Sequence, residues 1–343
     1  MTKVLFRSAF QWAATAGDVM RFAAATSHAD SVMSLHDDAE WEGGVGVQVE
    51  RDKWVRYPIQ EDPGEEWCIH FWARQHGGTT AVNGTGVVFQ LADASGGIGP
   101  LRIVALTSGR VSLQLSGSSV WASETDFSTT LRHYRLRVVE HATAGVIEFY
   151  VDSDLVYSSE NANTSRNGTA DRIQMGARTR REWRHSHVIL TDGENLGVGA
   201  LVSYFPASHD VAPNEWTKSD VNKDHFEHLS PTPHDGDTNY LRSEDAGEKT
   251  RHRAAISGLA DRRIVAAGVV AVARMEQESG DRLGLSVESG QAAPETSETG
   301  DFNETYTPRQ FPALEVDPDT SEAWTEQGLS GAEFEIEHLA PEG

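Results

Sequence analysis

The sequence predicts an all-β protein assembled from antiparallel sandwiches, and three observations support this. Apolar and polar residues alternate with a period of two in many short segments; in 146–151, for example, Ile147, Phe149 and Val151 share one face. Clusters of Gly, Ser, Asn and Asp separate such segments about every 8–12 residues, as in a sandwich or jelly roll. Helical periodicity is scarce, with one weak segment at about residues 9–25.

The strands of the first part of the chain follow from this alternation. Besides 146–151, the pattern occurs at 110–117, 133–140, 171–177 and 186–192. Residues Asp152 to Asp154 interrupt it, and apolar alternation resumes at Leu155. This predicts a hairpin with a two- or three-residue turn, because aspartate side chains accept hydrogen bonds from the NH groups of a turn.

A domain boundary is expected at residues 203–220, where alternation stops and prolines and polar residues take over. We therefore place one domain, an N-terminal segment plus a jelly roll, at 1–207. The second, at 208–343, is expected to be a smaller β-sandwich.

Three segments predict the strands of the second domain. Residues 262–276 predict one or two buried strands, and a further strand is expected at 283–289 before the polar insertion 291–305. In the last strand, 332–340, Phe334 and Ile336 alternate with three glutamates. This places the apolar pair on a buried face and the glutamates on a solvated one.

Composition excludes several classes of function. The chain has 343 residues, 38% of them hydrophobic, and a net charge of -23. A surface this acidic repels phosphate backbones and anionic lipid headgroups. We therefore expect that the protein does not bind nucleic acid and does not insert into a membrane. Cys68 is the only cysteine, which excludes an intrachain disulfide. The first residues lack the continuous apolar core of a signal peptide, so synthesis in a host cytoplasm is expected.

The segments from 133 to 192 resemble the concanavalin A-like or laminin-G-like jelly roll. In that family a hairpin of the form x-V-D-G-x-x-V precedes a strand of the form D-x-h-x-h-G, where h is apolar. Here the corresponding sequences are YVDSDLV, at 150–156, and DRIQMG, at 171–176. The segment WCIHFWARQ, at 67–75, is similar to an early central strand of the family, and the resemblance covers about residues 40 to 200.

The second domain resembles a family of structural proteins of tailed (phage-like) viruses. Those proteins share D-G-D-T-x-Y and D-P-x-T-x-x-x-W-T patterns, found here at 235–240 and 317–325. The resemblance implies a non-enzymatic component of a virion, such as a capsid decoration, turret, neck or tail appendage. It also implies a homo-oligomer whose partners are other virion proteins of the capsid, neck or tail.

The alternative function is attachment to a host surface glycan through the jelly roll. Its candidate residues are two tryptophans and a local basic patch: Trp121, Trp183, Arg178, Arg180, Arg181 and Arg184. An exposed tryptophan can stack on a sugar, and an arginine patch can bind an acidic glycan or a neighbouring subunit. Core or interface packing of the tryptophans and a solvated arginine loop are the competing interpretations.

Calcium is the one cofactor that the sequence suggests, at two places. Asp152 and Asp154 lie at the hairpin tip, while Asp235, Asp237 and Asn239 alternate like the first ligands of a calcium loop. The second match lacks the glutamate expected at its twelfth position, and both sets are also typical of polar turns.

No catalytic residues are predicted. The Glu-x-Asp-x-x-Glu pattern of jelly-roll glucanases is absent, and the run Glu333, Glu335, Glu337 has the spacing of one solvated strand face. A glycoside hydrolase therefore ranks below the structural and glycan-binding hypotheses, and the sequence leads us to expect a protein that is not an enzyme.

Overall fold

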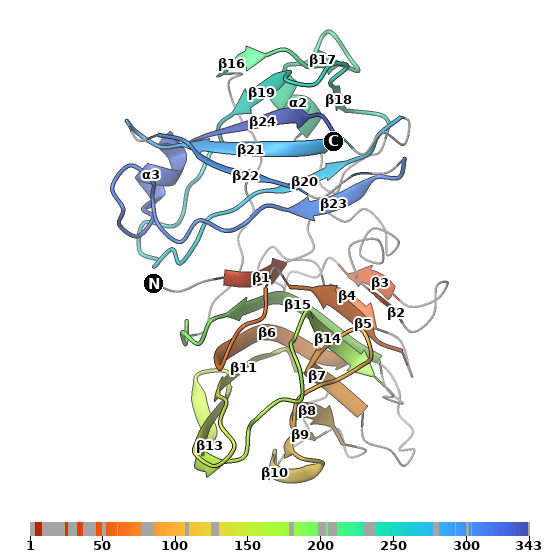
Figure 1. Ribbon diagram of the computed structural model, residues 1–343, viewed down its shortest axis with the longest axis vertical. Coiled ribbons are helices and arrows are strands. Elements are labelled where there is room, and N and C mark those ends of the chain that lie inside the picture. Colours follow the sequence, from red (N-terminus) through yellow and green to blue (C-terminus); the bar gives the residue numbers. More distant parts are fainter. Residues whose placement is uncertain are drawn as a thin grey trace. The chain divides into compact units, whose positions relative to one another are not determined.

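The computed structural model divides along the chain between residues 202 and 203 into two compact units. The structure describes residues 4–8, 25–26, 33–36, 46–49, 53–59, 61–76, 86–106, 110–124, 130–177, 182–197, 204, 211–229, 237–276, 281–291, 293–299, 302 and 304–341. Both units are built almost entirely from antiparallel strands, so the predicted all-β class is confirmed (Figure 1).

The first unit is a sandwich of two antiparallel sheets. One sheet runs β13 (Asp154–Ala162), β12 (Gly145–Val151), β11 (Arg132–Val139), β6 (Glu66–His76), β15 (Glu182–Thr191), β4 (Gly46–Val49), β3 (Met33–His36), with β1 (Val4–Ser8) also paired to β15. The other runs β10 (Ser118–Ala122), β9 (Val111–Leu115), β8 (Leu101–Ala105), β7 (Gly86–Ala92), β14 (Arg172–Ala177), β5 (Val55–Pro58), β2 (Ala25–Thr26).

Aromatic side chains from both sheets fill the core of the first unit. Phe71 of β6 lies between Tyr134 of β11 and Phe89 of β7, with ring centroids 5.4 and 5.9 Å away. Along β12, Ile147 and Phe149 are fully buried, as their alternation predicts. Burying each such side chain stabilises the fold by about 1.5–3 kcal/mol, so this aromatic layer holds the two sheets together.

A glycine marks one close approach between the two sheets. Gly176, the penultimate residue of β14, has φ +65°, a conformation that L side chains rarely adopt. A Cβ at this position would lie 2.8 Å from Cγ1 of Val49. The glycine at the end of the D-x-h-x-h-G segment is therefore required both by the backbone and by the packing.

The hairpin between β12 and β13 has the predicted two-residue turn. Val151 pairs with Asp154, leaving Asp152 and Ser153 at the tip. Asp152 has φ +57°, and its carboxylate accepts a hydrogen bond from the backbone NH of His133 at 3.0 Å. It also forms an ion pair with Arg132, at 2.6 Å. The aspartate thus ties the turn to the neighbouring strand.

The second unit is arranged around one five-stranded sheet and two short ribbons. The sheet runs β16 (Val211–Asn214), β19 (Lys249–His252), β24 (Glu333–Leu339), β21 (Arg282–Glu288), β22 (Glu295–Glu298). The ribbons are β17 (Thr217–Lys218) with β18 (Leu241–Arg242), and β20 (Val270–Ala273) with β23 (Thr307–Gln310); the helices are α2 (His225–Leu229) and α3 (Glu326–Gly331). Among the described residues, the helices are too short to span a bilayer.

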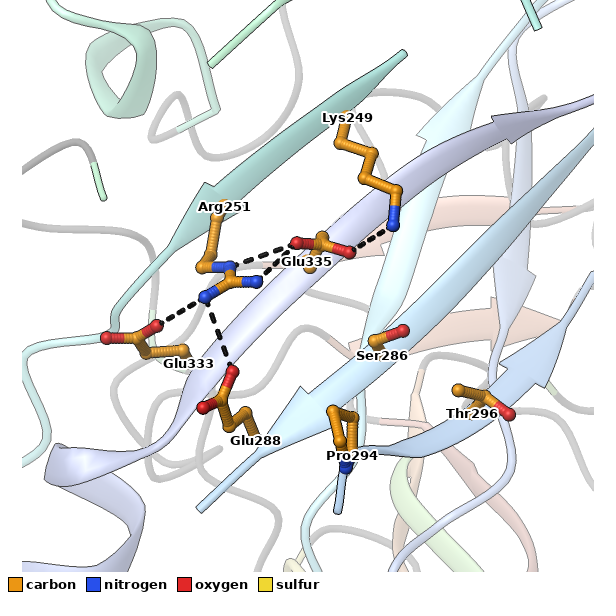
Figure 2. Close-up of a pocket in the computed structure, with 8 residues that line it drawn as sticks. All are labelled: Lys249, Arg251, Ser286, Glu288, Pro294, Thr296, Glu333 and Glu335. Carbon is orange, nitrogen blue, oxygen red and sulfur yellow. Dashed lines mark hydrogen bonds and ion pairs between the residues drawn. The ribbon is translucent and has the colours of Figure 1, made fainter. Parts of the chain in front are cut away.

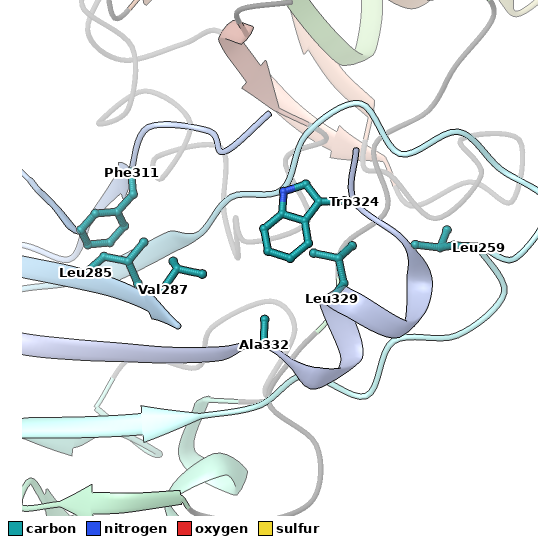
Figure 3. Close-up of a cluster of buried hydrophobic side chains, with 7 residues drawn as sticks. All are labelled: Leu259, Leu285, Val287, Phe311, Trp324, Leu329 and Ala332. Atoms are coloured by element: carbon teal, nitrogen blue, oxygen red, sulfur yellow. The ribbon is translucent and has the colours of Figure 1, made fainter. Parts of the chain in front are cut away.

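The core of the second unit lies against one face of this sheet (Figure 3). Its buried members are Leu259, Leu285, Val287, Phe311, Trp324, Leu329 and Ala332. Phe334 and Ile336 of β24 pack against this cluster, which confirms the face predicted for them. Trp324, the tryptophan of the D-P-x-T-x-x-x-W-T pattern, is 3% exposed, and its indole NH donates to the carbonyl of Leu314. That tryptophan therefore has a structural role.

Three buried histidines of the first unit have strongly lowered pKa values. His185 of β15 points into the core, where its Nε2 lies 2.9 Å from the hydroxyl of Tyr57. Burial lowers the pKa of His185 to about 3, of His70 to about 3 and of His133 to about 4. All three are therefore neutral in the folded chain at neutral pH.

These lowered pKa values predict that the protein loses stability in mild acid. Unfolded histidines take up protons below about pH 6.5, whereas the buried ones do so only near pH 4 or below, so protonation favours the unfolded chain in that window. The free energy of unfolding should fall by about 1.4 kcal/mol per pH unit for each such histidine. Urea unfolding between those pH values measures the slope.

A single substitution separates this effect from carboxylate titration. His185→Gln should remove about one third of the slope due to these histidines, because one of the three with a lowered pKa no longer contributes. A slope unchanged by the substitution would mean that His185 is not excluded from protonation in the folded chain.

Candidate functional site

The candidate site is the face of the eight-stranded sheet that points away from the aromatic core, which we call the polar face. Its residues come from three adjacent strands: Cys68, His70 and Trp72 of β6, His133, Arg135 and Arg137 of β11, and Glu148 and Tyr150 of β12. Strand alternation places them there, because the intervening residues, such as Phe71 and Tyr134, fill the core.

Strand register sets the neighbours on this face. His133 pairs with Trp72, and Arg135 lies between His70 on one side and Tyr150 on the other. The rings of His133 and Trp72 have centroids 5.3 Å apart. The guanidinium carbon of Arg135 lies 3.8 Å from the centre of the Tyr150 ring, which is a cation–π contact.

The centre of the polar face is buried. His133 is 1% and Arg135 5% exposed, whereas Trp72 and Tyr150 are half-buried. The segment after β15 contributes to this cover, because a Cβ built at Gly197 would lie 4.0 Å from Nη1 of Arg135. We call Trp72, His133, Arg135 and Tyr150 the quartet, because they combine buried polar groups with partly open aromatic rings.

Two polar atoms of the quartet have no hydrogen-bond partner among the described residues. They are Nδ1 of His133 and Nε of Arg135, both buried. Burial, together with the positive charge of Arg135, lowers the pKa of His133 to about 4, so its ring is neutral. A neutral imidazole can donate from one nitrogen and accept at the other. The quartet therefore offers a buried cation and an imidazole nitrogen to a ligand.

Three carboxylates near the quartet form ion pairs with arginines other than Arg135. Arg137, two residues along β11, forms ion pairs with Glu66 at 2.5 Å and with Glu148 at 3.3 Å. Asp152 is occupied by Arg132. In the part of the chain that the structure describes, Arg135 has no carboxylate partner, and its contact is the face of Tyr150.

The second unit has a polar face of its own, with a groove of about 330 Å³ (Figure 2). The groove is lined by Lys249, Arg251, Ser286, Glu288, Pro294, Thr296, Glu333 and Glu335. Figure 2 shows Arg251 at the centre of the charged side chains, opposite Glu335 on the next strand. Arg251 lies 2.6 Å from Glu335, 3.0 Å from Glu333 and 3.3 Å from Glu288.

Every charged side chain lining this groove has a partner of opposite sign. Lys249 contacts Glu335 at 2.9 Å, so that one carboxylate receives two cations. Burial alone would raise the pKa of Glu335, but hydrogen bonds from Lys249 and Arg251 hold it below its usual value. The glutamates of β24, expected on a solvated face, thus belong to an ion-pair network that joins β19, β24 and β21.

Three of the predicted glycan-binding residues are described, and each packs against other parts of the sandwich. Trp183 is buried, at 2% exposure, and Arg184 is also buried, with its Nε donating to Gln48 at 3.0 Å. Trp121 packs its ring edge-to-face against core Phe149, with centroids 5.3 Å apart. Trp183 and Arg184 are therefore not exposed, and the packing of both tryptophans agrees with the competing interpretation of core packing. Arg178, Arg180 and Arg181 lie outside the described residues.

Three of the predicted calcium ligands, Asp152, Asp237 and Asn239, are bonded to other protein groups. Asp152 is held by Arg132 and a backbone NH, while Asp154 is exposed at the hairpin. Asp237 accepts hydrogen bonds from Arg274 at 2.8 Å and Tyr306 at 2.9 Å.

Asn239, in turn, accepts a hydrogen bond from Lys223. Asp235 lies outside the described residues, and within them no group of three or more His, Cys, Asp or Glu side chains is arranged to hold a metal ion. The geometry of the described residues thus favours the turn interpretation of these side chains.

The quartet was not among the residues predicted from the sequence. One signal was present: in 133–138, His133 and Arg135 alternate with apolar residues, which places them together on one face. Their meeting with Trp72 and Tyr150 depends on strands that are far apart in the sequence. Their burial depends on the segment after β15, and the alternation does not reveal it.

Comparison with known proteins finds solved structures whose folds resemble part of this chain. Neither models of known protein families nor curated protein sequences match the chain. One similar solved structure is the catalytic domain of a glycoside hydrolase family 131 protein from Coprinopsis cinerea, with 12% identity, 58% of this chain and 98% of that chain covered, and a TM-score of 0.37.

Two further structures are similar. An endo-β-1,4-glucuronan lyase from Trichoderma reesei is 9% identical, with 49% of this chain and 94% of that chain covered and a TM-score of 0.35. The carbohydrate recognition domain of Emp46p is 14% identical, with 48% of this chain and 89% of that chain covered and a TM-score of 0.33.

These matches correct one expectation. The sequence led us to expect a protein that is not an enzyme, yet a lyase and a glycoside hydrolase are among the similar structures, so that expectation is contradicted. The named proteins are carbohydrate-active or carbohydrate-binding, and none of them is described as viral. At these identities the likeness concerns the fold, and none of their activities is thereby assigned to this chain.

The ion-pair network of the second unit predicts a clear effect on stability. Arg251→Gln leaves Glu335, whose side chain is 8% exposed, without its closest cation. We expect a loss of about 2–3 kcal/mol in the free energy of unfolding, because an incompletely paired buried carboxylate is costly. Urea unfolding measures it.

Arg253→Gln is the matched control. Arg253 also pairs with a glutamate of this network, Glu333, but its side chain is 51% exposed. Its loss should cost less than about 1 kcal/mol. Equal effects of the two substitutions would show that burial does not govern the strength of this network.

Proposed function

We propose that the first unit binds a saccharide on its polar face, through the quartet. The observation that carries this proposal is the pair of buried polar atoms without partners, Nδ1 of His133 and Nε of Arg135, beside two half-buried aromatic rings. An unsatisfied buried donor or acceptor costs about 1–3 kcal/mol. Oxygen atoms of a bound ligand would recover part of that cost.

The composition of the quartet matches what a sugar requires. The rings of Trp72 and Tyr150 offer flat apolar surfaces, on which the CH face of a sugar ring can stack. His133 and Arg135 offer directional hydrogen bonds of the kind that fix the orientation of hydroxyl groups. Ligand sites typically combine such apolar surfaces with a few placed polar groups.

The assignment to a tailed-virus particle remains a prediction that rests on the sequence patterns at 235–240 and 317–325. We propose it as the setting of saccharide binding, since a virion appendage can attach the particle to a host surface glycan while contacting other virion proteins. Cryo-EM of purified virions, with this chain located in the map, tests the setting. A particle without the chain would overturn it and leave saccharide binding to be judged separately.

Saccharide binding is tested with Trp72→Ala. The wild-type chain should bind members of a glycan array, and the variant should lose about tenfold or more in affinity, because a stacking surface is removed; tenfold corresponds to about 1.4 kcal/mol. Isothermal titration calorimetry on the strongest glycan measures the change. Circular dichroism checks that the variant is folded.

Trp121→Ala is the control of the same chemistry. Trp121 packs on Phe149 at the edge of the core, away from the quartet, so its removal should lower the melting temperature and leave the affinity unchanged. Equal losses of affinity in the two variants, or no glycan bound by the wild-type chain, would refute saccharide binding by the quartet.

A further inference from the structure

We infer that the saccharide carries a carboxylate, which the guanidinium of Arg135 binds. This inference rests on the proposed function and names the chemical class of its ligand. Its basis is that Arg135 is a buried cation without a counter-charge among the described residues, in the middle of a strand whose other arginines are paired.

The arginines of β11 provide an internal comparison. Arg132 is paired with Asp152, and Arg137 with both Glu66 and Glu148. Arg135 is 5% exposed and more deeply buried than either, yet it lacks a carboxylate. Burying an unpaired charge is far more costly than burying a paired one. The face is therefore electrostatically incomplete at Arg135, and an anionic ligand completes it.

The orientation of the guanidinium favours a planar anion. Its face is stacked on the ring of Tyr150, with 3.8 Å between the guanidinium carbon and the ring centre. Stacking leaves the edge of the group, where its N–H bonds lie, for hydrogen bonding, and Nε on that edge has no partner. A carboxylate matches two parallel N–H donors of an arginine in one plane.

The neighbouring histidine supports the same ligand. The ring of His133 is neutral and adds no charge of its own, and its Nδ1, which has no hydrogen-bond partner among the described residues, can bond to a hydroxyl next to the carboxylate. A uronic acid or a sialic acid has both groups on one ring.

The overall charge of the protein makes a local cation necessary for such a ligand. With a net charge of -23, the chain repels an anion at long range. A buried guanidinium acts at short range and in a medium of low dielectric constant, where the attraction is least screened. Selection of an acidic saccharide therefore depends on Arg135 more than on the surface as a whole.

The experiment begins with an array of neutral, carboxylated and sulfated glycans. The bound glycans should carry carboxylates, and reducing the carboxyl group of the strongest glycan to an alcohol should weaken its binding at least tenfold. Equal binding of the reduced form would overturn this inference and leave saccharide binding intact. A preference for sulfate esters would also overturn it. No binding to any glycan would overturn the proposed function as well.

Two substitutions of Arg135 itself test its role. Arg135→Gln should abolish the preference for the carboxylated glycan over its reduced form, without lowering the melting temperature, because it removes an unpaired buried charge. Arg135→Lys should restore part of the preference, since it keeps the charge but not the planar donor pair.

Arg137→Gln should do the reverse, lowering the melting temperature through loss of its two ion pairs while the preference stays at the wild-type value. A preference for the carboxylated glycan that survives in Arg135→Gln would overturn the inference. So would its loss in the folded Arg137→Gln variant.

Discussion

The first unit depends on one constraint, the period of two along β6, β11 and β12. Apolar residues at alternate positions fill the aromatic core, and the remaining positions are thereby forced onto the opposite face, whatever their chemistry. Because that face is covered at its centre, its polar side chains cannot rely on water. Each must find a partner in the protein or leave an interaction for a ligand.

The two units meet this constraint differently. In the second unit, Arg251 has three carboxylates within 3.3 Å, and the network joins three strands of the sheet. In the first unit, Arg135 has an aromatic ring and no carboxylate among the described residues. The same side chain on the same type of strand is thus fully paired in one place and incompletely paired in the other. This contrast is why we assign a structural role to the groove of Figure 2 and a ligand to the quartet.

Local alternation allowed the strands and their buried faces to be predicted. Ile147, Phe149, Phe334 and Ile336 face the cores as expected, and the turn at Asp152 lies where the alternation stops. Those features depend on residues close together in the sequence. Side-chain roles that depend on distant partners were predicted poorly.

Three residues show why such roles escape the sequence. Trp183 and Arg184 appeared to belong to a basic surface, but β15 lies between β6 and β4, and Arg184 bonds to Gln48, which is 136 residues away. A register shift between Ser186 and Ile189 breaks the alternation along β15, where His187 has φ +48°, and His185 just before the shift lies in the core. The quartet escaped for the same reason: its four members come from three strands, and their cover comes from a fourth segment.

Arg135 is a buried cation without a carboxylate partner among the described residues, and we infer that a ligand supplies one. A crystal structure of the chain with its strongest carboxylated glycan tests this. We expect a carboxylate oxygen within hydrogen-bonding distance of Nε of Arg135, with the sugar ring against Trp72 or Tyr150. A glycan bound elsewhere, with Nε of Arg135 still unpartnered, would contradict it.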